Sequence, residues 1–303
     1  MRIVSLLSSA TETVCALGLE SSLVGRSHEC DAPSSILLLP ACTRARIDAS
    51  ASSAVIDAAV KLSLTNALSL YEVDGPLLQR LQPDLLITQD LCKVCAVSTQ
   101  DVEEAVCRMI GSRPRIIAVN PQGLDDVWND MRLIADAIGV PERGVELVNN
   151  LKERLRDLAA RANGWGRRPT VACLEWLDPL MAAGNWMPEL VELAGGVNLF
   201  GDKGKHSPWM SFDDLLREDP DVIVAMPCGF DLPRTRREMA PLIHRPGWER
   251  LRAVRHGRVH LADGNAFFNR PGPRLVEATE MLAEAIQPGA FSFGHAGMVL
   301  SHG

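Results

Sequence analysis

Short apolar runs rich in β-branched residues alternate along this chain with longer stretches in which apolar residues recur at helical spacing. The first stretch of helical spacing carries Val14, Leu17 and Leu19, and the preceding Ser9-Ala10-Thr11-Glu12 has the form of a capping box. Strands that alternate with helices are typical of parallel sheets. We therefore predict strands at residues 2–7, 23–25, 84–88, 115–119, 170–174, 221–226 and 258–262, with helices near 98–110, 188–194 and 274–286.

One long helical pattern divides the chain. Pro141 suits a helix start, and apolar residues recur from Val145 to Ala159 until Gly164 and Gly166 end the pattern. A helix of about 21 residues spans roughly 30 Å, enough to cross a small domain. We therefore expect an N-terminal α/β lobe over residues 1–125, a helical connector over 126–166, a C-terminal α/β lobe over 167–290, and a loose tail over 291–303.

Unusual polar residues follow two predicted strands of the first lobe. His28-Glu29-Cys30-Asp31 comes after the strand at 23–25, and a loop with Cys92 and Cys95 comes after the strand at 84–88. In an α/β sheet, ligands bind where the strands end at their carboxyl side. If these strands are parallel, the two clusters share that edge, and the sequence predicts a cleft built for a ligand.

The second lobe repeats this arrangement with aromatic and amide side chains. Each predicted strand leads into a loop that we expect on the same side of the sheet. Large flat aromatics beside Asn and Asp suit a large, partly apolar, amide-bearing ligand, although tryptophans in such loops can equally cap the core of the lobe. The segments are Glu175-Trp176-Leu177-Asp178-Pro179, Ala183-Gly184-Asn185-Trp186, Pro227-Cys228-Gly229-Phe230-Asp231 and 263–272.

The composition is that of a globular protein. Of 303 residues, 47% are hydrophobic and 23% charged, and the formal charge of −7 disfavours nucleic acid or an anionic membrane as partner. The densest basic stretch, 234–237, is expected to be a solvated helix face. No apolar stretch is long enough to predict a transmembrane helix. Eight scattered cysteines and a short first apolar run predict a cytoplasmic location, or a periplasmic one if the native start lies further upstream.

The cysteines and histidines leave several chemistries open. His28, Cys30, Cys92 and Cys95 can close a tetrahedral zinc site, but the His-x-Cys pair is not a standard half-site. Small buried thiols are the simpler interpretation, and a redox disulfide between Cys92 and Cys95 is a third. The nucleotide-binding, metalloprotease and serine-hydrolase motifs are absent from the sequence, so we assign no catalytic residue.

Several short segments of both lobes form an ordered set. They are Arg2-Ile3-Val4-Ser5-Leu6, Ser9-Ala10-Thr11-Glu12, Val24-Gly25 with Ser27 and Asp31-Ala32-Pro33, Leu81-Gln82-Pro83-Asp84-Leu85, Ala183-Gly184, 190–200, Pro208-Trp209 and 219–224. In this order, over about residues 2–287, the chain resembles the ABC-transporter substrate-binding proteins of the cobalamin and iron-siderophore group. The His-Glu-Cys-Asp and Leu-Cys-x-Val-Cys-Ala-Val-Ser segments look like a signal-less branch of that family.

The resemblance implies an α/β fold of two Rossmann-like lobes with mainly parallel sheets, joined by one long α-helix, the class III substrate-binding protein fold. It also implies non-catalytic binding of a corrinoid such as cobalamin between the lobes, for uptake, salvage or trafficking. By position, Glu29 and Gln89 replace ligand-contacting aromatics, whereas Trp209 and Asp263 match retained pocket residues. The ligand-binding residues that we expect are Ser9, His28, Glu29, Cys30, Asp31, Gln89, Asp90, Cys92, Glu175, Trp176, Gly184, Asn185, Trp186, Trp209, Asp263, Phe267, Phe268 and Asn269.

The resemblance also implies a partner. Family members dock to the membrane subunits of an ABC transporter through one acidic residue on each lobe. Asp213 fits this place in the second lobe. In the first lobe the position is Pro76, with Glu72 and Asp74 nearby. No direct membrane insertion is expected.

Other functions remain open at this level. The added His28 and cysteines are reasonable ligands for cobalt through a side chain. Haem, an iron-siderophore or zinc are other candidate ligands. The competing class is an enzyme, since chelatases that insert metal into tetrapyrroles also use two α/β lobes, with His28 or Glu175 as base or metal holder. The motif D-x-H-x-x-G of methyl-transfer cobalamin domains is absent from the sequence.

Overall fold

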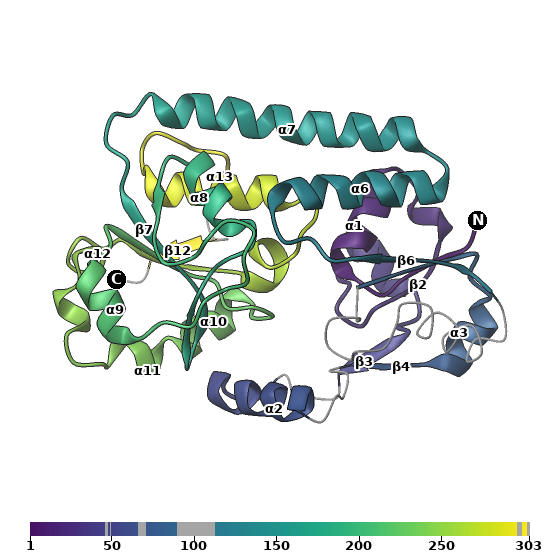
Figure 1. The fold of residues 1–303 in the computed structure, drawn as a ribbon, viewed down its shortest axis with the longest axis horizontal. Helices are drawn as coiled ribbons and strands as arrows, with labels where there is room; N and C mark the ends of the chain where they lie inside the picture. The colour runs from purple at the N-terminus through teal and green to yellow at the C-terminus, as the bar shows by residue number, and fades with distance from the viewer. Residues whose placement is uncertain (46–47, 49, 66–70, 90–112, 296–298, 302–303) are drawn as a thin grey trace. The chain divides into compact units, whose positions relative to one another are not determined.

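The computed structural model describes residues 1–45, 48, 50–65, 71–89, 113–295 and 299–301, and it divides the chain into two compact units (Figure 1). The first unit comprises residues 1–51, 55–121 and 126–149. The second unit comprises residues 52–54, 122–125 and 150–303. Both are α/β, as the alternating pattern predicts.

A parallel four-stranded sheet forms the centre of the first unit. Its order is β2-β1-β5-β6, and all three pairings are parallel. The four predicted strands are thereby confirmed as β1 (Ile3–Ser5), β2 (Leu23–Arg26), β5 (Leu85–Gln89) and β6 (Arg115–Val119). A separate antiparallel pair joins β3 (Thr43–Ala45) to β4 (Tyr71–Val73). Helices and 3-10 turns complete this part of the chain as α1 (Ser8–Ala16), η1 (Glu20–Ser22), η2 (Ser34–Leu38), α2 (Ser53–Thr65), α3 (Gly75–Leu81) and α6 (Leu124–Ile138).

Alternation along the strands buries both faces of this sheet. Ile3 and Leu85 face one layer, where Val14 of α1 belongs to the same buried cluster. Their neighbours Val4 and Leu86 face the opposite layer. Successive side chains of a strand point to opposite faces, so near-continuous apolar runs are typical of a sheet covered on both sides.

The start of α1 differs from its prediction. The helix begins at Ser8 with Leu7 as N-cap, and no side chain caps it. Two threonine hydroxyls in this helix donate to the backbone four residues earlier: Thr11 Oγ1 to the Leu7 carbonyl at 3.2 Å, and Thr13 Oγ1 to the Ser9 carbonyl at 2.8 Å. The predicted capping box is therefore wrong, because the helix begins two residues too early for Ser9 to act as its N-cap. The helix predicted near 98–110 lies outside the described residues.

The predicted long helix is α7, which covers Pro141–Asn163 in 23 residues. It starts at the expected proline and ends directly before Gly164. The boundary between the two units falls inside it, between Asn149 and Asn150. No helix in the described parts of the chain is long and apolar enough to cross a membrane.

The second unit is built on a mixed sheet in the order β12-β11-β10-β7-β8. The three central strands are parallel and match their predictions, whereas β8 and β12 run antiparallel at the edges and β9 pairs with the start of β7. The strands are β7 (Thr170–Leu177), β8 (Leu180–Ala182), β9 (Val197–Asn198), β10 (Val222–Ala225), β11 (Val259–Ala262) and β12 (Val299–Ser301). The helices are α8 (Met187–Leu193), α9 (Phe212–Glu218), α10 (Leu232–Glu238), α11 (Ala240–Ile243), η3 (Trp248–Arg250), α12 (Arg252–Arg255), η4 (Gly264–Phe268) and α13 (Leu275–Ile286).

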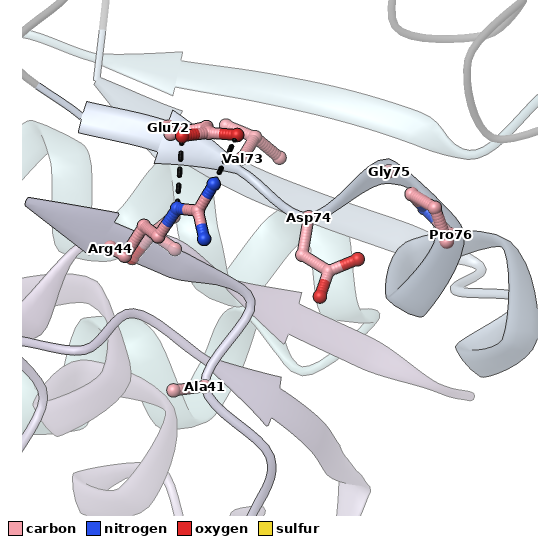
Figure 2. Close-up of a pocket in the computed structure, with 8 residues that line it drawn as sticks. Ala41, Arg44, Glu72, Val73, Asp74, Gly75 and Pro76 are labelled. Atoms are coloured by element: carbon pink, nitrogen blue, oxygen red, sulfur yellow. Dashed lines mark hydrogen bonds and ion pairs between the residues drawn. The ribbon is translucent and has the colours of Figure 1, made fainter. Parts of the chain in front are cut away.

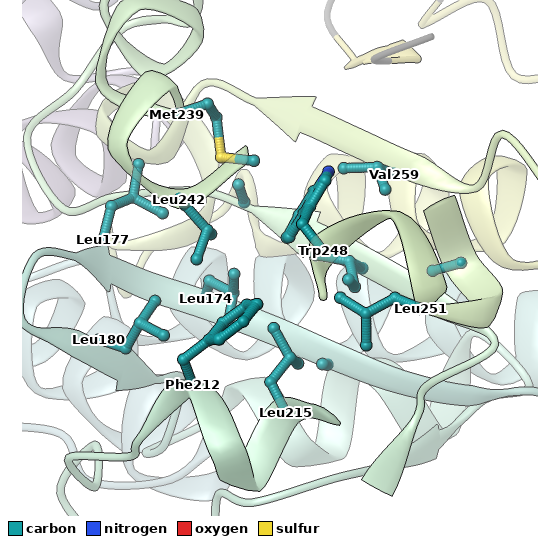
Figure 3. Packing of buried hydrophobic residues seen from close by; sticks show 14 of the residues in the cluster. Leu174, Leu177, Leu180, Phe212, Leu215, Met239, Leu242, Trp248, Leu251 and Val259 are labelled. Carbon is teal, nitrogen blue, oxygen red and sulfur yellow. The ribbon is translucent and has the colours of Figure 1, made fainter. Parts of the chain in front are cut away.

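One core of the second unit packs short helices against the sheet (Figure 3). Leu174 from β7 and Val259 from β11 meet Phe212 of α9, Leu242 of α11 and Trp248 of η3 in one buried cluster. Burying a large apolar side chain stabilises a fold by about 1.5–3 kcal/mol, so this cluster holds the central strands in place. The basic stretch 234–237 lies on α10, and Arg236 and Arg237 are exposed as expected.

The tail is not a loose end. Its last described residues form β12, which pairs with β11 in the register Ala262↔Val299 to His260↔Ser301. Before that strand, His295 Nε2 lies 2.8 Å from Glu280 Oε2 on α13. Pairing to a sheet edge orders a segment whatever its periodicity, and a three-residue strand is too short to show an alternating pattern. The expectation of a loose tail is therefore wrong.

Candidate functional site

Several segments of the second unit line a single cavity. The segments after the parallel strands β10 and β11 supply Cys228 and Asn269, as the edge rule predicts. The other lining residues differ from the prediction, since Glu175 lies within β7 and residues 184–187 follow the antiparallel strand β8. The cavity has a volume of about 140 Å³. Its lining residues are Glu175, Gly184, Asn185, Trp186, Met187, Cys228 and Asn269. All but Met187 and Cys228 belong to the predicted ligand-binding set.

Glu175 is positioned by an irregularity in β7. The strand continues through Leu177, so Glu175 lies within it and not in the loop that follows. In the pairing with β8, Leu174 faces Ala182 and Trp176 faces Met181, and Glu175 has no partner in this register. An extra residue of this kind bends a strand and redirects its side chain. Here that side chain lines the cavity.

A short hydrogen-bond chain holds the Glu175 carboxyl group. Ser207 Oγ donates to Glu175 Oε2 at 2.8 Å, and the Gly184 backbone N–H donates to Ser207 Oγ at 3.0 Å. Burial raises the pKa of Glu175, against the opposing effects of the Ser207 hydrogen bond and the charge of His206. Glu175 therefore keeps its proton to a higher pH than an ordinary glutamic acid.

The backbone of Gly184 and Asn185 is fixed by close packing. A Cβ on Gly184 would lie 2.5 Å from the Lys205 carbonyl oxygen, so only glycine fits. Asn185 has a φ of 53°, in the left-handed region that asparagine tolerates, and its N–H donates to the Lys205 carbonyl at 2.7 Å. Its Oδ1 is buried and accepts no hydrogen bond from any described residue. A buried acceptor of this kind costs about 1–3 kcal/mol, which a ligand N–H would recover.

The other walls of the cavity are held by hydrogen bonds to the backbone. Trp186 is 7% exposed and its Nε1 donates to the Phe268 carbonyl at 2.9 Å. Asn269 Nδ2 donates to the carbonyls of Met226 and Gly264, both at 3.0 Å. These side chains are locked before any ligand arrives, which favours a preformed site.

The remaining predicted aromatics of the second unit do not line this cavity. Trp176 is 9% exposed and its ring centroid lies 5.1 Å from that of Phe230, so it caps the core, the alternative that the sequence left open. Phe268 is fully buried. Phe267 lies under the Arg274 guanidinium.

Two positions matched by resemblance also lie outside the cavity lining. Trp209 is 53% exposed and its backbone forms a bridge with Met181. Asp263 caps η4, since its Oδ1 accepts from the Ala266 N–H at 2.7 Å. Their ligand contacts stay predictions of the resemblance.

In the first unit, the predicted ligand residues after β2 contact neighbouring side chains. His28 Nδ1 lies 2.7 Å from Thr43 Oγ1, and the His28 ring centroid lies 5.3 Å from that of Tyr71. Tyr71 in turn donates its hydroxyl to Glu29 Oε1 at 2.9 Å. Asp31 is exposed beside them. The imidazole is thus held by Thr43 on one side and by an aromatic ring on another.

Cys30 does not reach that surface. It is 1% exposed in the core of the first unit, with its Sγ 3.1 Å from Thr11 Oγ1. The structure therefore favours the buried-thiol interpretation over the zinc-ligand one for this residue. The other half of the predicted metal site, Cys92 and Cys95, lies outside the described residues, as does Asp90. Over the described ranges, no three His, Cys, Asp or Glu side chains are grouped to hold a metal ion.

Two further residues of the first unit, Ser9 and Gln89, belong to the predicted ligand-binding set. Ser9 is 4% exposed inside α1, where its carbonyl accepts the hydroxyl of Thr13. Gln89 is exposed at the end of β5. Neither lines a described cavity.

A second cavity of about 350 Å³ lies in the first unit (Figure 2). Glu72 is paired with Arg44 through two contacts, of 2.7 Å and 2.9 Å, and Asp74 caps α3 by accepting the Leu77 N–H at 2.9 Å. The predicted docking residues Glu72 and Asp74 thus lie at its edge. The lining residues are Ala41, Thr43, Arg44, Glu72, Val73, Asp74, Gly75 and Pro76. Asp213, the docking residue predicted for the second unit, is exposed in the first turn of α9.

Sequence reasoning missed three residues at the Glu175 cavity. Cys228 follows β10 in a loop that was expected at this edge, so its position alone was a usable signal. Met187 is the first residue of α8 and carries no polar signal. Ser207 belongs to the long segment between β9 and α9, and no strand precedes it directly, so the edge rule cannot find it.

Comparison with known sequences gives one family and several relatives. The family described as "Periplasmic binding protein" matches residues 3–266. The "Vitamin B12-binding protein" of Vibrio cholerae is 25% identical over 283 residues, which cover 93% of this chain and 87% of that protein. The "Uncharacterized ABC transporter substrate-binding lipoprotein YvrC" of Bacillus subtilis is 25% identical over 220 residues, 70% of this chain, and the match spans 64% of its length.

Solved structures agree on the fold. A periplasmic heme-binding protein from Pseudomonas aeruginosa superposes with a TM-score of 0.72 at 23% identity, covering 100% of this chain and 98% of that one. The periplasmic vitamin B12-binding protein BtuF of Vibrio cholerae gives 0.64 at 22% identity, covering 94% and 96%. IsdE of S. aureus complexed with heme gives 0.69 at 16% identity, covering 94% and 98%. These likenesses confirm the predicted class III substrate-binding protein fold.

Proposed function

The chain belongs to the periplasmic binding protein family, and on that premise we propose that its ligand is a corrinoid of the cobalamin type. Members of this family are non-enzymatic substrate-binding proteins of ABC transporters, so the protein binds a small molecule and is not an enzyme. The chelatase alternative is thereby set aside. The cytoplasmic location expected from the sequence finds no support, since the relatives are described as periplasmic proteins or as a lipoprotein.

The chemistry of the Glu175 cavity is the observation that carries the corrinoid proposal. The rim of a corrinoid bears neutral carboxamides, whereas haem bears propionates, which proteins bind through Arg or Lys. The cavity offers the amide groups of Asn185 and Asn269 and the carboxyl group of Glu175, and neither Arg nor Lys is among the described residues that line it. A volume of about 140 Å³ suits one amide arm of a large ligand, not the whole ligand.

The names of the sequence relatives also support a corrinoid as the ligand. Three sequence relatives named for vitamin B12 match 93% of this chain. Among the structural neighbours, which are 16–23% identical, heme appears in several names and vitamin B12 in that of BtuF. Haem remains the second candidate, because a heme-binding protein superposes with a TM-score of 0.72. Zinc has no support in the described residues.

Titration calorimetry of the purified protein separates the two candidates. We expect cyanocobalamin to bind with one site per chain and haem to bind at least about tenfold more weakly, a difference of about 1.4 kcal/mol. Tight binding of haem without binding of cyanocobalamin would contradict the proposal.

We further propose delivery of this ligand to the membrane subunits of an ABC transporter. Asp213, exposed on α9, is the docking residue of the second unit, and Glu72 and Asp74 are the acidic residues near the corresponding place in the first. In vesicles that carry the transporter, Asp213→Asn should weaken docking while cyanocobalamin binding stays unchanged. Equal docking of both proteins would exclude Asp213 from this role.

A further inference from the structure

The Glu175 cavity combines a carboxyl group with one buried hydrogen-bonding atom that the described residues leave without a partner. Glu175 Oε2 accepts the Ser207 hydroxyl, so the other carboxyl oxygen, Oε1, is the one that can carry the proton. Asn185 Oδ1 is buried and accepts no hydrogen bond from the described residues. A site with one O–H donor beside one open acceptor is complementary to a group that has one acceptor and one donor.

We propose that Glu175 and Asn185 together recognise a primary carboxamide of the ligand. The Glu175 O–H donates to the amide oxygen, and Asn185 Oδ1 accepts one amide N–H. This inference rests on the proposed function, and it names the chemical group of the corrinoid by which the protein selects it. Glu175 is thus a specificity-determining residue of the binding site.

With Asn185 Oδ1 facing the ligand, this arrangement disfavours the carboxylate analogue of the same arm. A ligand carboxylate carries two acceptor oxygens and no N–H, so one oxygen would face Asn185 Oδ1 with no hydrogen between them. Asn185 cannot turn its backbone away, since its N–H is fixed to Lys205 and its carbonyl accepts from Gly204 at 2.9 Å. Sites built to pair a substrate N–H discriminate strongly against analogues that lack it.

The surroundings of Glu175 favour the protonated, donating form of its carboxyl group to a higher pH than in an ordinary glutamic acid. Burial is the largest influence on its pKa and raises it. Of the nearby titratable groups, His206 acts on Glu175 and Cys228 shares its cavity. Glu175 in turn acts on Cys173, whose pKa is raised to about 12 by burial and by the charge of Glu175. Of these, only the exposed His206 opposes the effect of burial, through its charge.

Two substitutions test the donor and the acceptor separately. Glu175→Gln replaces the titrating O–H with a non-titrating N–H of nearly the same shape. Asn185→Gly removes the acceptor and suits the left-handed backbone. Glu192→Gln, an exposed residue of α8 that lies outside the cavity lining, is the matched control. The probes are cyanocobalamin and its monocarboxylates, in which one rim amide is hydrolysed, and the thermal melting point of each variant reports folding.

We expect wild-type affinity for cyanocobalamin to fall as pH rises through the pKa of Glu175. Glu175→Gln should bind at low pH within a few-fold of wild type and show a flat pH profile. Asn185→Gly should bind about tenfold more weakly, as expected for the loss of one buried hydrogen bond. At least one monocarboxylate should bind about tenfold or more weakly than cyanocobalamin to wild type, and this discrimination should shrink in Asn185→Gly.

The outcomes distinguish this inference from the proposed function. If wild type binds cyanocobalamin and folded Glu175→Gln keeps the wild-type pH profile, the role of Glu175 is overturned while corrinoid binding stands. Equal binding of all monocarboxylates and cyanocobalamin to wild type overturns amide recognition in the same way. If wild type binds no cyanocobalamin at all, the proposed function fails, and this inference fails with it.

Discussion

The two units place polar residues at the same kind of sheet edge, but they fix these residues differently. In the second unit, backbone hydrogen bonds and glycines hold the segments, so that Glu175 and Asn185 keep atoms available to a ligand. In the first unit, the side chains hold one another, His28 with Thr43 and Tyr71 with Glu29. The comparison teaches that polar side chains at a sheet edge leave an acceptor such as Asn185 Oδ1 without a partner when they bond mainly to backbone groups and not to one another.

Of the substitutions considered, Gly184→Ala should have the largest effect, because it should disrupt the Glu175 cavity of the second unit. The added Cβ would lie 2.5 Å from a backbone oxygen, and overpacking of this kind costs about 1–3 kcal/mol. We expect this loss in urea unfolding, together with loss of cyanocobalamin binding in calorimetry. Gly164→Ala is the control, because its Cβ would be 3.4 Å from the nearest atom. Full binding by Gly184→Ala would show that the glycine does not shape the cavity.

His28→Ala tests whether the first unit contributes a cobalt ligand. The bond of Nδ1 to Thr43 leaves Nε2 as the ring nitrogen that can bind a metal, and a neighbour on the other nitrogen is the usual support of a metal-binding histidine. If Nε2 replaces the water on the cobalt of aquacobalamin, wild type should shift its absorbance spectrum and His28→Ala should not. The same shift in both proteins would limit the first unit to a role without cobalt coordination.

In each unit, one carboxyl group with a raised pKa should make the free energy of unfolding depend on pH. Burial, aided by the charge of Asp126, raises the pKa of Asp130 on α6 to about 6, and burial also raises that of Glu175. Each folded-state pKa is above its unfolded value, so the folded protein binds more protons and the free energy of unfolding falls as pH rises through this window. Asp130→Asn should remove the part of the fall that ends near pH 6, measured by urea unfolding between pH 4 and 8. An unchanged profile would contradict the burial of Asp130.

The smallest change in the free energy of unfolding is expected for a substitution at the second cavity, that of the first unit. Arg44 pairs with Glu72 at the surface, where the two side chains are 74% and 43% exposed. Exposed ion pairs contribute less than about 1 kcal/mol, so Arg44→Gln should change the free energy of unfolding by no more than that. A larger loss in urea unfolding would show that this pair organises the first unit.

The strands and the predicted ligand loops of the second unit were accessible to sequence reasoning, because a buried parallel strand is an apolar run and the segment after it lies at the ligand edge. The residues that hold the cavity side chains in place could not be predicted from the sequence. Ser207 reaches Glu175 across 32 positions of sequence, and the Asn185 N–H donates to the distant Lys205 carbonyl, contacts that no local sequence pattern encodes. Cys30 shows the limit of residue type as a signal, since a thiol suits a metal and a core equally well.

The strand β12 has a consequence for handling the protein. Val299–Ser301 occupies the outer side of β11, whose backbone groups would otherwise face solvent along three residues. Unpaired strand edges recruit strands of other molecules. Shortening the chain before residue 299 would therefore expose this edge of β11 and favour self-association, even though every residue of the Glu175 cavity would remain.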